Sequence, residues 1–378
     1  MMYRIPESWG VRREPRTPKN IRDNLFTFGL SFQEQFDWDI LFSDAIRVSD
    51  TQVLLIGAPL YELKNILQFT HGNQILNHNV VDLDRCSITV VQTSSDVIFL
   101  RDLQINITPR STKFKDLGCI TTMQKNEPFH WIRDWIKYYY TEHNVRGFVI
   151  YNNNSTDYST EELRENLKSI DLDVLIEVVD WSMPYGPETP SWDSDFSRYI
   201  MYENFKHRYG WCCKYVLNQD IDEFFIVDGG NIDDVYQYMI DNQYHGILYG
   251  NRNIDPYNEK RDCSSKSLEV SERNFKDYYY YTGKTNSDNM WGGKWSISKW
   301  ITIPSQSLNF QWRNHDIPGA SMLVTDKSEW QIYFAHFYAM QSKNQIHNPV
   351  HFDRNVSKDS VSNLKLDSLL KTKLEEIF

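Results

Sequence analysis

The chain has 378 residues, with 40 Lys and Arg against 51 Asp and Glu, which gives a formal net charge of −11 at pH 7. This length suits one large domain or two medium ones. The acidic balance argues against a general nucleic-acid binder, which needs a basic face. No stretch reaches the roughly 20 apolar residues of a transmembrane helix.

The cysteines and the N-terminal residues indicate the cellular compartment in which we expect the protein. The five cysteines are odd in number and include no CxxC spacing, which favours reduced thiols over disulfides or zinc. The first 20 residues are basic but lack the apolar segment of a signal peptide. We therefore expect a cytoplasmic protein, with peripheral association at the inner face of a membrane left open.

The N-terminal third predicts β-structure. Residues 1–22 are polar and contain prolines, and we expect a polar arm. Residues 23–112 consist of short apolar or alternating runs such as "TQVLLIGAP" and "SITVVQ", which predict a β-rich domain. No motif here carries chemistry, so structural, oligomeric and acceptor-binding roles all stay open.

From residue 113 the pattern changes to alternating strands and helices. "LGCITTMQ", "GFVIYN" and "DVLIEVV" are typical of buried strands. The helix after the first strand has one apolar stripe, formed by Phe129, Ile132, Trp135, Ile136 and Tyr139. "STEE" at residues 159–162 is a capping box that opens a second helix.

A third helix over about 193–209 leads into a fourth apolar run, and residues 351–378 predict a helical tail. Strands that alternate with helices predict an α/β domain with a mostly parallel sheet over residues 113–350. Such sheets bind ligands at the carboxyl ends of their strands.

Three acidic residues interrupt the fourth apolar run, "KYVLNQDIDEFFIV". Unpaired buried carboxylates are costly. In one continuous strand, Asp220 and Asp222 would point to the same side. Two carboxylates suit Mg²⁺ or Mn²⁺, which complete their shell with water and substrate phosphates. The run therefore predicts a cation and diphosphate site, and the competing interpretation is an exposed turn at the end of a strand.

Several segments together resemble one known family. "TTMQKNEPFHWIRDWIKYYYTEHNVRGFVIYNNNS" resembles the opening of glycosyltransferase family 92 and of the related bacterial family-2-like transferases. "KYVLNQDIDEFF" is similar to the family's DxDEF strand. "GILYGNRN", "SKWITIPSQSLNFQWRNHDI" and "AHFYAMQS" resemble later family elements, in the same order. The resemblance covers about residues 117–345. Asn152 and Asn153 depart from it, because an Asp is common there.

The resemblance implies a GT-A fold, which is Rossmann-like with a mostly parallel sheet, and a nucleotide-sugar donor that is commonly UDP-linked. It implies a cation held by Asp222 and by a histidine later in the chain. His336 is the first candidate for this histidine and His315 is the second. Asp220 would contact the ribose or share the cation through water. The other candidates for the donor site are Thr121, Thr122, Asn126, Asn153 and Arg198. Ordinary hydrogen bonds at a strand end would explain Thr121, Thr122 and Asn126 equally well, and an ordinary helix-surface arginine would explain Arg198. The departure at Asn153 weakens its assignment to the ribose or base.

Direct displacement at a sugar's anomeric carbon also needs a general base near the acceptor hydroxyl. Asp288 and Asp316 are candidates, since both lie in polar stretches of the second half. Glu223 follows the acidic pair and is expected to support the strand instead.

These features favour a metal-dependent, inverting hexosyltransferase that moves a sugar from a nucleotide-diphosphate donor to an oligosaccharide, polysaccharide or lipid-linked acceptor. One alternative is a metal-dependent nucleotidyltransferase, but "TTMQKNE" lacks the glycines of a phosphate loop. Another is a non-catalytic carbohydrate-binding or scaffold protein, which the 15% aromatic content would suit. The sugar, the base of the donor, the acceptor and the linkage stay open.

Overall fold

A computed structural model of the chain describes residues 2–15, 30–187, 194–258, 263–264, 268–281, 298–325, 331–340 and 364–378. The chain divides into two compact units. Unit 1 comprises Met1–Lys113, Asp180–Cys212 and Leu308–Asn314. Unit 2 comprises Phe114–Val179, Cys213–Ser307 and His315–Phe378. Within the described residues, no helix is both long and apolar enough to cross a membrane.

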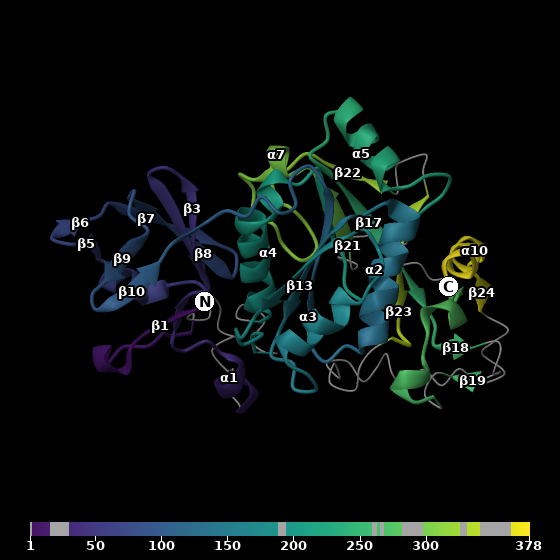
Figure 1. Cartoon of the computed structure of the whole chain (residues 1–378), viewed down its shortest axis with the longest axis horizontal. Helices are drawn as coiled ribbons and strands as arrows, with labels where there is room; N and C mark the ends of the chain where they lie inside the picture. The colour runs from purple at the N-terminus through teal and green to yellow at the C-terminus, as the bar shows by residue number, and fades with distance from the viewer. Residues whose placement is uncertain are drawn as a thin grey trace, which may run out of the picture. The chain divides into compact units, whose positions relative to one another are not determined.

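Unit 1 contains two mainly antiparallel sheets, drawn in purple and blue in Figure 1. The first has the order β11 (Thr108–Pro109), β3 (Asp44–Ser49), β4 (Gln52–Gly57), β8 (Cys86–Gln92) and β7 (His78–Leu83). The second has the order β10 (Leu103–Asn106), β9 (Val97–Leu100), β5 (Phe69–His71) and β6 (Gln74–Ile75). Buried side chains from both sheets, including Val53, Val91, Phe69 and Ile98, share one hydrophobic core. The predicted β-rich character is confirmed for residues 30–112, the part of the range 23–112 that the structure describes.

The N-terminal residues 2–15, expected as a polar arm, pack into unit 1. Strand β1 (Tyr3–Arg4) pairs antiparallel with β2 (Ile40–Phe42). The side chain of Tyr3 lies in the core of unit 1. The buried guanidinium of Arg13 pairs with Asp37 at 3.2 Å.

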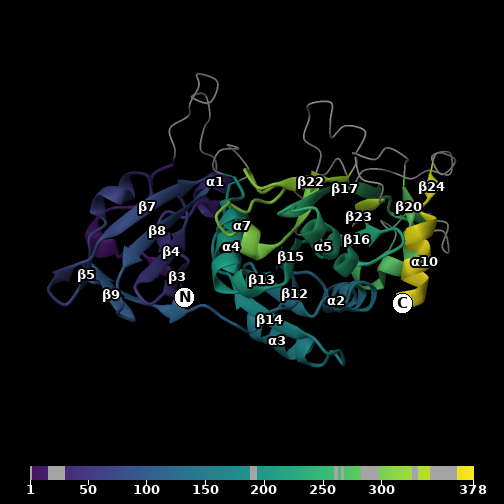
Figure 2. The same cartoon turned by 90° about the horizontal axis from the view of Figure 1, so that it is seen from above.

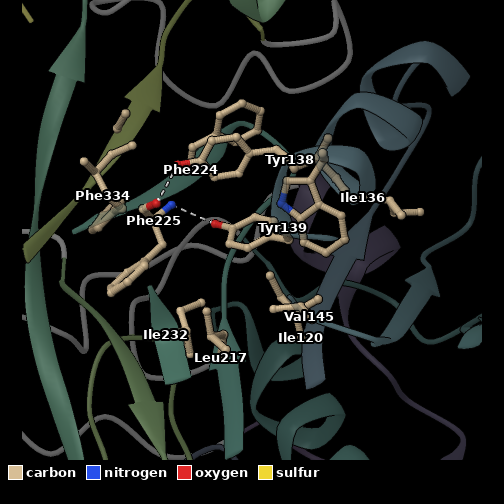
Figure 3. Close-up of a cluster of buried hydrophobic side chains, with 14 of the residues drawn as sticks. Ile120, Ile136, Tyr138, Tyr139, Val145, Leu217, Phe224, Phe225, Ile232 and Phe334 are labelled. Atoms are coloured by element: carbon tan, nitrogen blue, oxygen red, sulfur yellow. Dashed lines mark hydrogen bonds between the residues drawn. The ribbon is translucent and has the colours of Figure 1, made fainter. Parts of the chain in front are cut away.

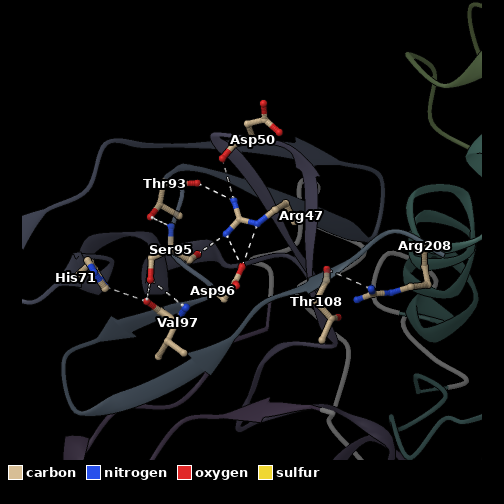
Figure 4. Close-up of polar contacts among 9 residues, drawn as sticks. All are labelled: Arg47, Asp50, His71, Thr93, Ser95, Asp96, Val97, Thr108 and Arg208. Carbon is tan, nitrogen blue, oxygen red and sulfur yellow. Dashed lines mark hydrogen bonds and ion pairs between the residues drawn. The ribbon is translucent and has the colours of Figure 1, made fainter. Parts of the chain in front are cut away.

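Helix α4 (Phe196–Arg208) also belongs to unit 1. The Arg208 guanidinium pairs with Asp44 on β3 at 2.6 Å. It also donates to the carbonyl of Thr108 at 3.3 Å, as Figure 4 shows. The Trp312 amide donates to Glu203 of this helix at 3.1 Å. These polar contacts join segments that are far apart in the sequence.

Unit 2 is built on a mixed sheet that has nine strands within the described part of the chain. The strand order is β14 (Leu175–Asp180), β13 (Gly147–Asn152), β12 (Gly118–Gln124), β15 (Tyr215–Asn218), β21 (Ser298–Thr302), β17 (Gly246–Ile254), β23 (Ile332–Phe337) and β16 (Glu223–Val227), with β22 (Met322–Val324) beside β17. Strand β12 runs parallel to β13 and β15, whereas β21 is antiparallel to β15 and β17. The expected α/β class is confirmed (Figures 1 and 2).

Four helices contribute apolar side chains to the core of unit 2. They are α2 (Phe129–His143), α3 (Thr160–Lys168), α5 (Ile232–Asp241) and α10 (Ser368–Ile377). The predicted stripe of α2 is confirmed, because Ile132, Trp135, Ile136 and Tyr139 are fully buried. The capping box of α3 is also confirmed: the Ser159 side chain accepts from the Glu162 amide, and Glu162 reaches back to the Ser159 amide.

The predicted fourth strand is wrong as a single strand. Strand β15 ends at Asn218, and β16 begins at Glu223 in a different place in the sheet. The Glu223 amide donates to the Asp220 carbonyl at 3.1 Å, which is the hydrogen bond of a β-turn. Asp220 and Asp222 therefore lie in a turn, and strand alternation does not place them on one side.

Strand β16 lies at the end of the strand order, and side chains of α2 satisfy its outer backbone groups (Figure 3). The Tyr139 hydroxyl donates to the Glu223 carbonyl at 3.0 Å and accepts from the Phe225 amide at 2.9 Å. The Tyr138 hydroxyl and His143 Nε2 both bind the Phe225 carbonyl, at 2.7 and 2.8 Å. Because unpaired backbone groups are costly, α2 takes the place of a neighbouring strand and fixes the start of β16.

Candidate functional site

The turn formed by Asp220–Glu223, which we call the acidic turn, is held closed by its own last residue. Besides the backbone bond of the turn, Glu223 Oε2 accepts from the Asp220 amide at 2.9 Å. The Glu223 side chain is buried, whereas those of Asp220 and Asp222 are 20% and 15% exposed. As expected from the sequence, Glu223 has a supporting role, while the two aspartates remain accessible.

Lys299 lies beside the acidic turn, and the sequence analysis missed it. It comes from β21 and its side chain is 1% exposed. Its Nζ is 2.8 Å from Asp220 Oδ2 and 3.0 Å from Glu223 Oε2. A single lysine inside the apolar strand "SISKWITIP" was the available signal, because a buried lysine requires a charged partner.

His336, which lies on β23, also contacts the acidic turn. It lies opposite Glu223 in the antiparallel ladder, and its Nε2 is 3.3 Å from Asp222 Oδ2. The Phe337 amide donates to the Asp222 carbonyl at 2.9 Å, which fixes this end of the turn against β23. His336 Nδ1 is buried and has no hydrogen-bond partner among the residues described. We call Asp220, Asp222, Glu223, Lys299 and His336 the acidic cluster.

Burial and neighbouring charges shift the pKa values of His336 and Glu223 in opposite directions. Burial alone lowers the pKa of His336, but the carboxylates of Asp222 and Glu223 outweigh it and raise that pKa above its ordinary value. Burial raises the pKa of Glu223, and the ammonium of Lys299 opposes the shift. The cluster is thus a set of strongly interacting charges in a largely buried place.

The acidic cluster fits a divalent cation that also has non-protein ligands. In the part of the chain that the structure describes, no three His, Cys, Asp or Glu side chains are placed to hold a metal by themselves. Asp222 and His336 offer an oxygen and a nitrogen 3.3 Å apart. Adjacent ligands of an octahedral ion with bonds of about 2.1 Å are separated by about 3 Å. Water and substrate phosphates would supply the other positions.

His315, the second histidine candidate, is placed differently from His336. Its Nδ1 is 2.8 Å from the carbonyl of Ser298, and its own carbonyl accepts from the Ser298 hydroxyl at 2.6 Å. It therefore contacts the neighbour of Lys299, whereas His336 contacts Asp222 directly.

The nucleotide candidates on β12 lie where the sequence predicts, but their roles differ. Thr121 and Thr122 are buried, and neither hydroxyl has a hydrogen-bond partner within the described ranges. As consecutive strand residues they point to opposite faces, so one ligand cannot meet both hydroxyls.

Asn126 follows β12 and joins two loops, with φ of 59°. Its Oδ1 accepts from the amides of Thr156 and Asp157 at 2.7 and 3.1 Å, and its Nδ2 donates to Thr156 Oγ1 at 3.0 Å. The Asn153 amide donates to the Gln124 carbonyl at 2.8 Å. The Asn126 side chain therefore ties the loop after β12 to the loop after β13.

An open cavity of about 470 Å³ lies beside these loops. Phe129, Asp157, Tyr158 and three glutamates of α3 line it. Its carboxylates would repel a diphosphate, so the cavity does not suit that part of a donor.

The remaining candidates are dispersed. Arg198 lies on α4 of unit 1, and its Nη1 donates to Asn314 at 3.1 Å. Asp316 is half-buried in unit 2, directly after His315. Asp288 lies outside the described residues.

The chain is similar to a known protein family and, weakly, to several solved structures. No curated protein matches the chain in sequence. Among solved structures, the mannosyltransferase Ktr4p from S. cerevisiae matches at 19% identity and a TM-score of 0.28, over 51% of this chain and 57% of that one. S. aureus TarS 1–349, solved in complex with UDP-GlcNAc, matches at 8% identity and 0.31, over 59% and 58%. Core-mannan synthase A from Aspergillus fumigatus, in its Mn/GDP form, matches at 12% and 0.26, over 50% and 60%.

In these three pairs the chain spans under two thirds of the other chain's length, and the TM-scores are too low to support an argument. The family model for glycosyltransferase family 92, in contrast, matches residues 117–369, which include β12, the acidic turn, Lys299 and His336. The chain belongs to glycosyltransferase family 92.

Proposed function

We propose that this chain is a metal-dependent, inverting glycosyltransferase that uses a nucleotide-diphosphate sugar, with a UDP-sugar as the first candidate. The observation that carries the proposal is the 3.3 Å contact between Asp222 and His336 in a chain of family 92. An oxygen and a nitrogen ligand meet at an acidic turn that carries more negative than positive charge.

Each member of the acidic cluster has a role in this proposal. Asp222 and His336 would hold Mn²⁺ or Mg²⁺, which, when bound, neutralises the charge that develops on the departing diphosphate. Glu223 and Lys299 keep the turn closed. Asp220 is left to accept a hydrogen bond from a donor hydroxyl such as that of the ribose.

The acceptor reacts on the other side of the sugar. Direct displacement requires a base that removes the proton from the acceptor hydroxyl as the new bond forms, and it requires no covalent intermediate. Asp316 and Asp288 remain the candidates for this base. An oligosaccharide, a polysaccharide or a lipid-linked saccharide would each supply the hydroxyl.

Thermal unfolding with UDP, GDP, CMP and ADP, each with and without Mn²⁺, tests the proposal. A ligand at about 100 times its Kd adds about 2.7 kcal/mol to the free energy of unfolding, which raises Tm by a few degrees in a protein of this size. We expect one nucleoside diphosphate to raise Tm only with Mn²⁺, and we expect Asp222→Ala to lose this shift.

Asp228→Ala is the matched control, because Asp228 is exposed just beyond the far end of β16. It should keep the full nucleotide shift. A shift that needs no Mn²⁺, or that survives in Asp222→Ala, would contradict the proposed metal site. No shift with any nucleotide would favour a carbohydrate-binding or scaffold protein.

A further inference from the structure

We propose that Lys299 is a built-in counter-ion that limits the acidic turn to one weakly held divalent cation, so that the cation binds tightly only together with the diphosphate of the donor. This inference rests on the proposed function, because it concerns the cation of that site. Lys299 is a positioning residue that acts through Asp220 and Glu223.

The position of Lys299 excludes direct contact with a donor. Its side chain is 1% exposed, and its Nζ lies within 3.0 Å of one carboxylate oxygen from Asp220 and one from Glu223. A lysine that binds phosphate has to present its ammonium to the ligand as a point charge. Lys299 instead directs its charge toward the interior side of the acidic turn.

Its charge sets the balance of the acidic cluster. The three carboxylates of Asp220, Asp222 and Glu223 face one ammonium, and His336 is uncharged when it acts as a ligand. Two negative charges therefore remain in excess, and one divalent cation balances them. Without Lys299 the excess would be three, and the free turn would attract a cation more strongly.

The same charge also lowers the affinity of the cation for the free protein. An ammonium near the cation repels it, and this repulsion is strong where the surroundings are poorly solvated. A diphosphate brings negative charge and oxygen ligands of its own, which offset the repulsion. Cation and donor should thus bind cooperatively, and donor release should free the cation.

Mn²⁺ titrations followed by electron paramagnetic resonance test the inference without measuring activity. The titrations are run with and without UDP, at one fixed pH for all variants. Four proteins form a charge series: wild type, Lys299→Met, Glu223→Gln and the double variant. The expected Kd for Mn²⁺ alone is roughly tenfold lower in Lys299→Met and roughly tenfold higher in Glu223→Gln, because one charge is changed in each.

The double variant restores the charge balance and should return to within about threefold of the wild-type Kd. Lys214→Met is the matched control, because Lys214 pairs with Asp233 at 2.5 Å just before the opposite end of β15. It should leave the Kd for Mn²⁺ unchanged. UDP should tighten Mn²⁺ binding in wild type far more than in Lys299→Met.

The sign of the change separates the outcomes. If Lys299 only supported the fold, Lys299→Met would bind Mn²⁺ more weakly, and that result would overturn the inference. If Lys299→Met does not fold, the test is Glu223→Gln: a Kd for Mn²⁺ equal to that of wild type would also overturn the inference. If wild type binds no Mn²⁺ with or without any nucleotide, the proposed metal dependence fails, and the inference fails with it.

Discussion

Two regions at the strand ends of unit 2 hold buried polar side chains in different ways, one through hydrogen bonds between neutral groups and the other through contacts between charged groups. At the ends of β12 and β13, neutral side chains bind one another: Gln124 Nε2 donates to Asn152 Oδ1 at 2.6 Å, and Asn152 Nδ2 donates to the Thr160 hydroxyl at 2.9 Å. In the acidic cluster, charges face each other across three strands and a turn.

The two regions differ in how their polar groups and charges are balanced. The Asn126 amide in the loops uses both its oxygen and its nitrogen within the protein. The acidic cluster has an excess of negative charge and a buried His336 nitrogen with no partner among the described residues. Hydrogen bonds between neutral side chains stabilise a fold, whereas an excess of partly buried charge is typical of a binding site.

The sharpest test of this comparison is Asp222→Asn. This change keeps the shape of the side chain but removes the negative charge that a cation requires. We expect kcat/KM of the transferase to fall by at least about a hundredfold, with little change in stability, because the side chain is partly exposed. Steady-state kinetics and urea unfolding measure the two effects. A large loss of stability would mean that Asp222 is structural.

Asn126→Ala should give the opposite pattern. It removes three hydrogen bonds and places alanine at φ of 59°, where non-glycine side chains are strained. We expect the free energy of unfolding to fall by about 2–3 kcal/mol, with Mn²⁺ binding unchanged.

Asn126→Gly separates the two contributions, since glycine relieves the strain but restores no hydrogen bond. It should recover part of the loss measured by urea unfolding. If Asn126→Ala instead abolished nucleotide binding in a stable protein, this residue would belong to the donor site.

His143, which links α2 to β16, should make the stability of the protein depend on pH. Burial lowers the pKa of His143 to about 3, so the folded protein holds this ring neutral. The unfolded chain takes up a proton near pH 6.5. The neutral ring therefore contributes its full stabilisation above that pH, and this contribution is lost as the pH falls toward 3. At pH 5 the free energy of unfolding should be lower by about 2 kcal/mol.

Urea unfolding at neutral pH and near pH 5 measures this loss. His143→Gln keeps a donor for the Phe225 carbonyl but has no titrating ring, so it should lose less stability on acidification. His207, whose pKa burial lowers to about 4, contributes in the same direction and remains in the variant. An unchanged acid dependence in His143→Gln would mean that His143 is already protonated in the folded state.

The smallest effect is expected at the capping box of α3. Ser159→Ala removes the side-chain acceptor for the Glu162 amide, at 3.1 Å. It should cost about 1 kcal/mol of stability. Donor binding should not change, because the cap is a local hydrogen bond, and Ser159→Asp should recover the lost stability since aspartate is also a good N-cap.

Local patterns in the sequence predicted those parts of the fold that depend on neighbouring residues. The stripe of α2, the capping box of α3 and the buried strand β12 follow from spacing and from capping chemistry. The run from Lys214 to Val227 was interpreted wrongly as one strand because both β15 and β16 are apolar. Periodicity does not show that two consecutive strands separate to different places in a sheet.

The sequence by itself determined the α/β class and the family resemblance, and it singled out Asp220 and Asp222 as candidates for a site, because these depend on composition and short-range spacing. Only the tertiary structure showed that Lys299 compensates Asp220 and Glu223, and that His336 contacts Asp222. Those contacts join residues 76 to 114 positions apart, and pairing of distant strands follows from packing of the whole sheet. For the same reason, the sequence did not show that 180–212 and 308–314 group with the N-terminal strands in unit 1.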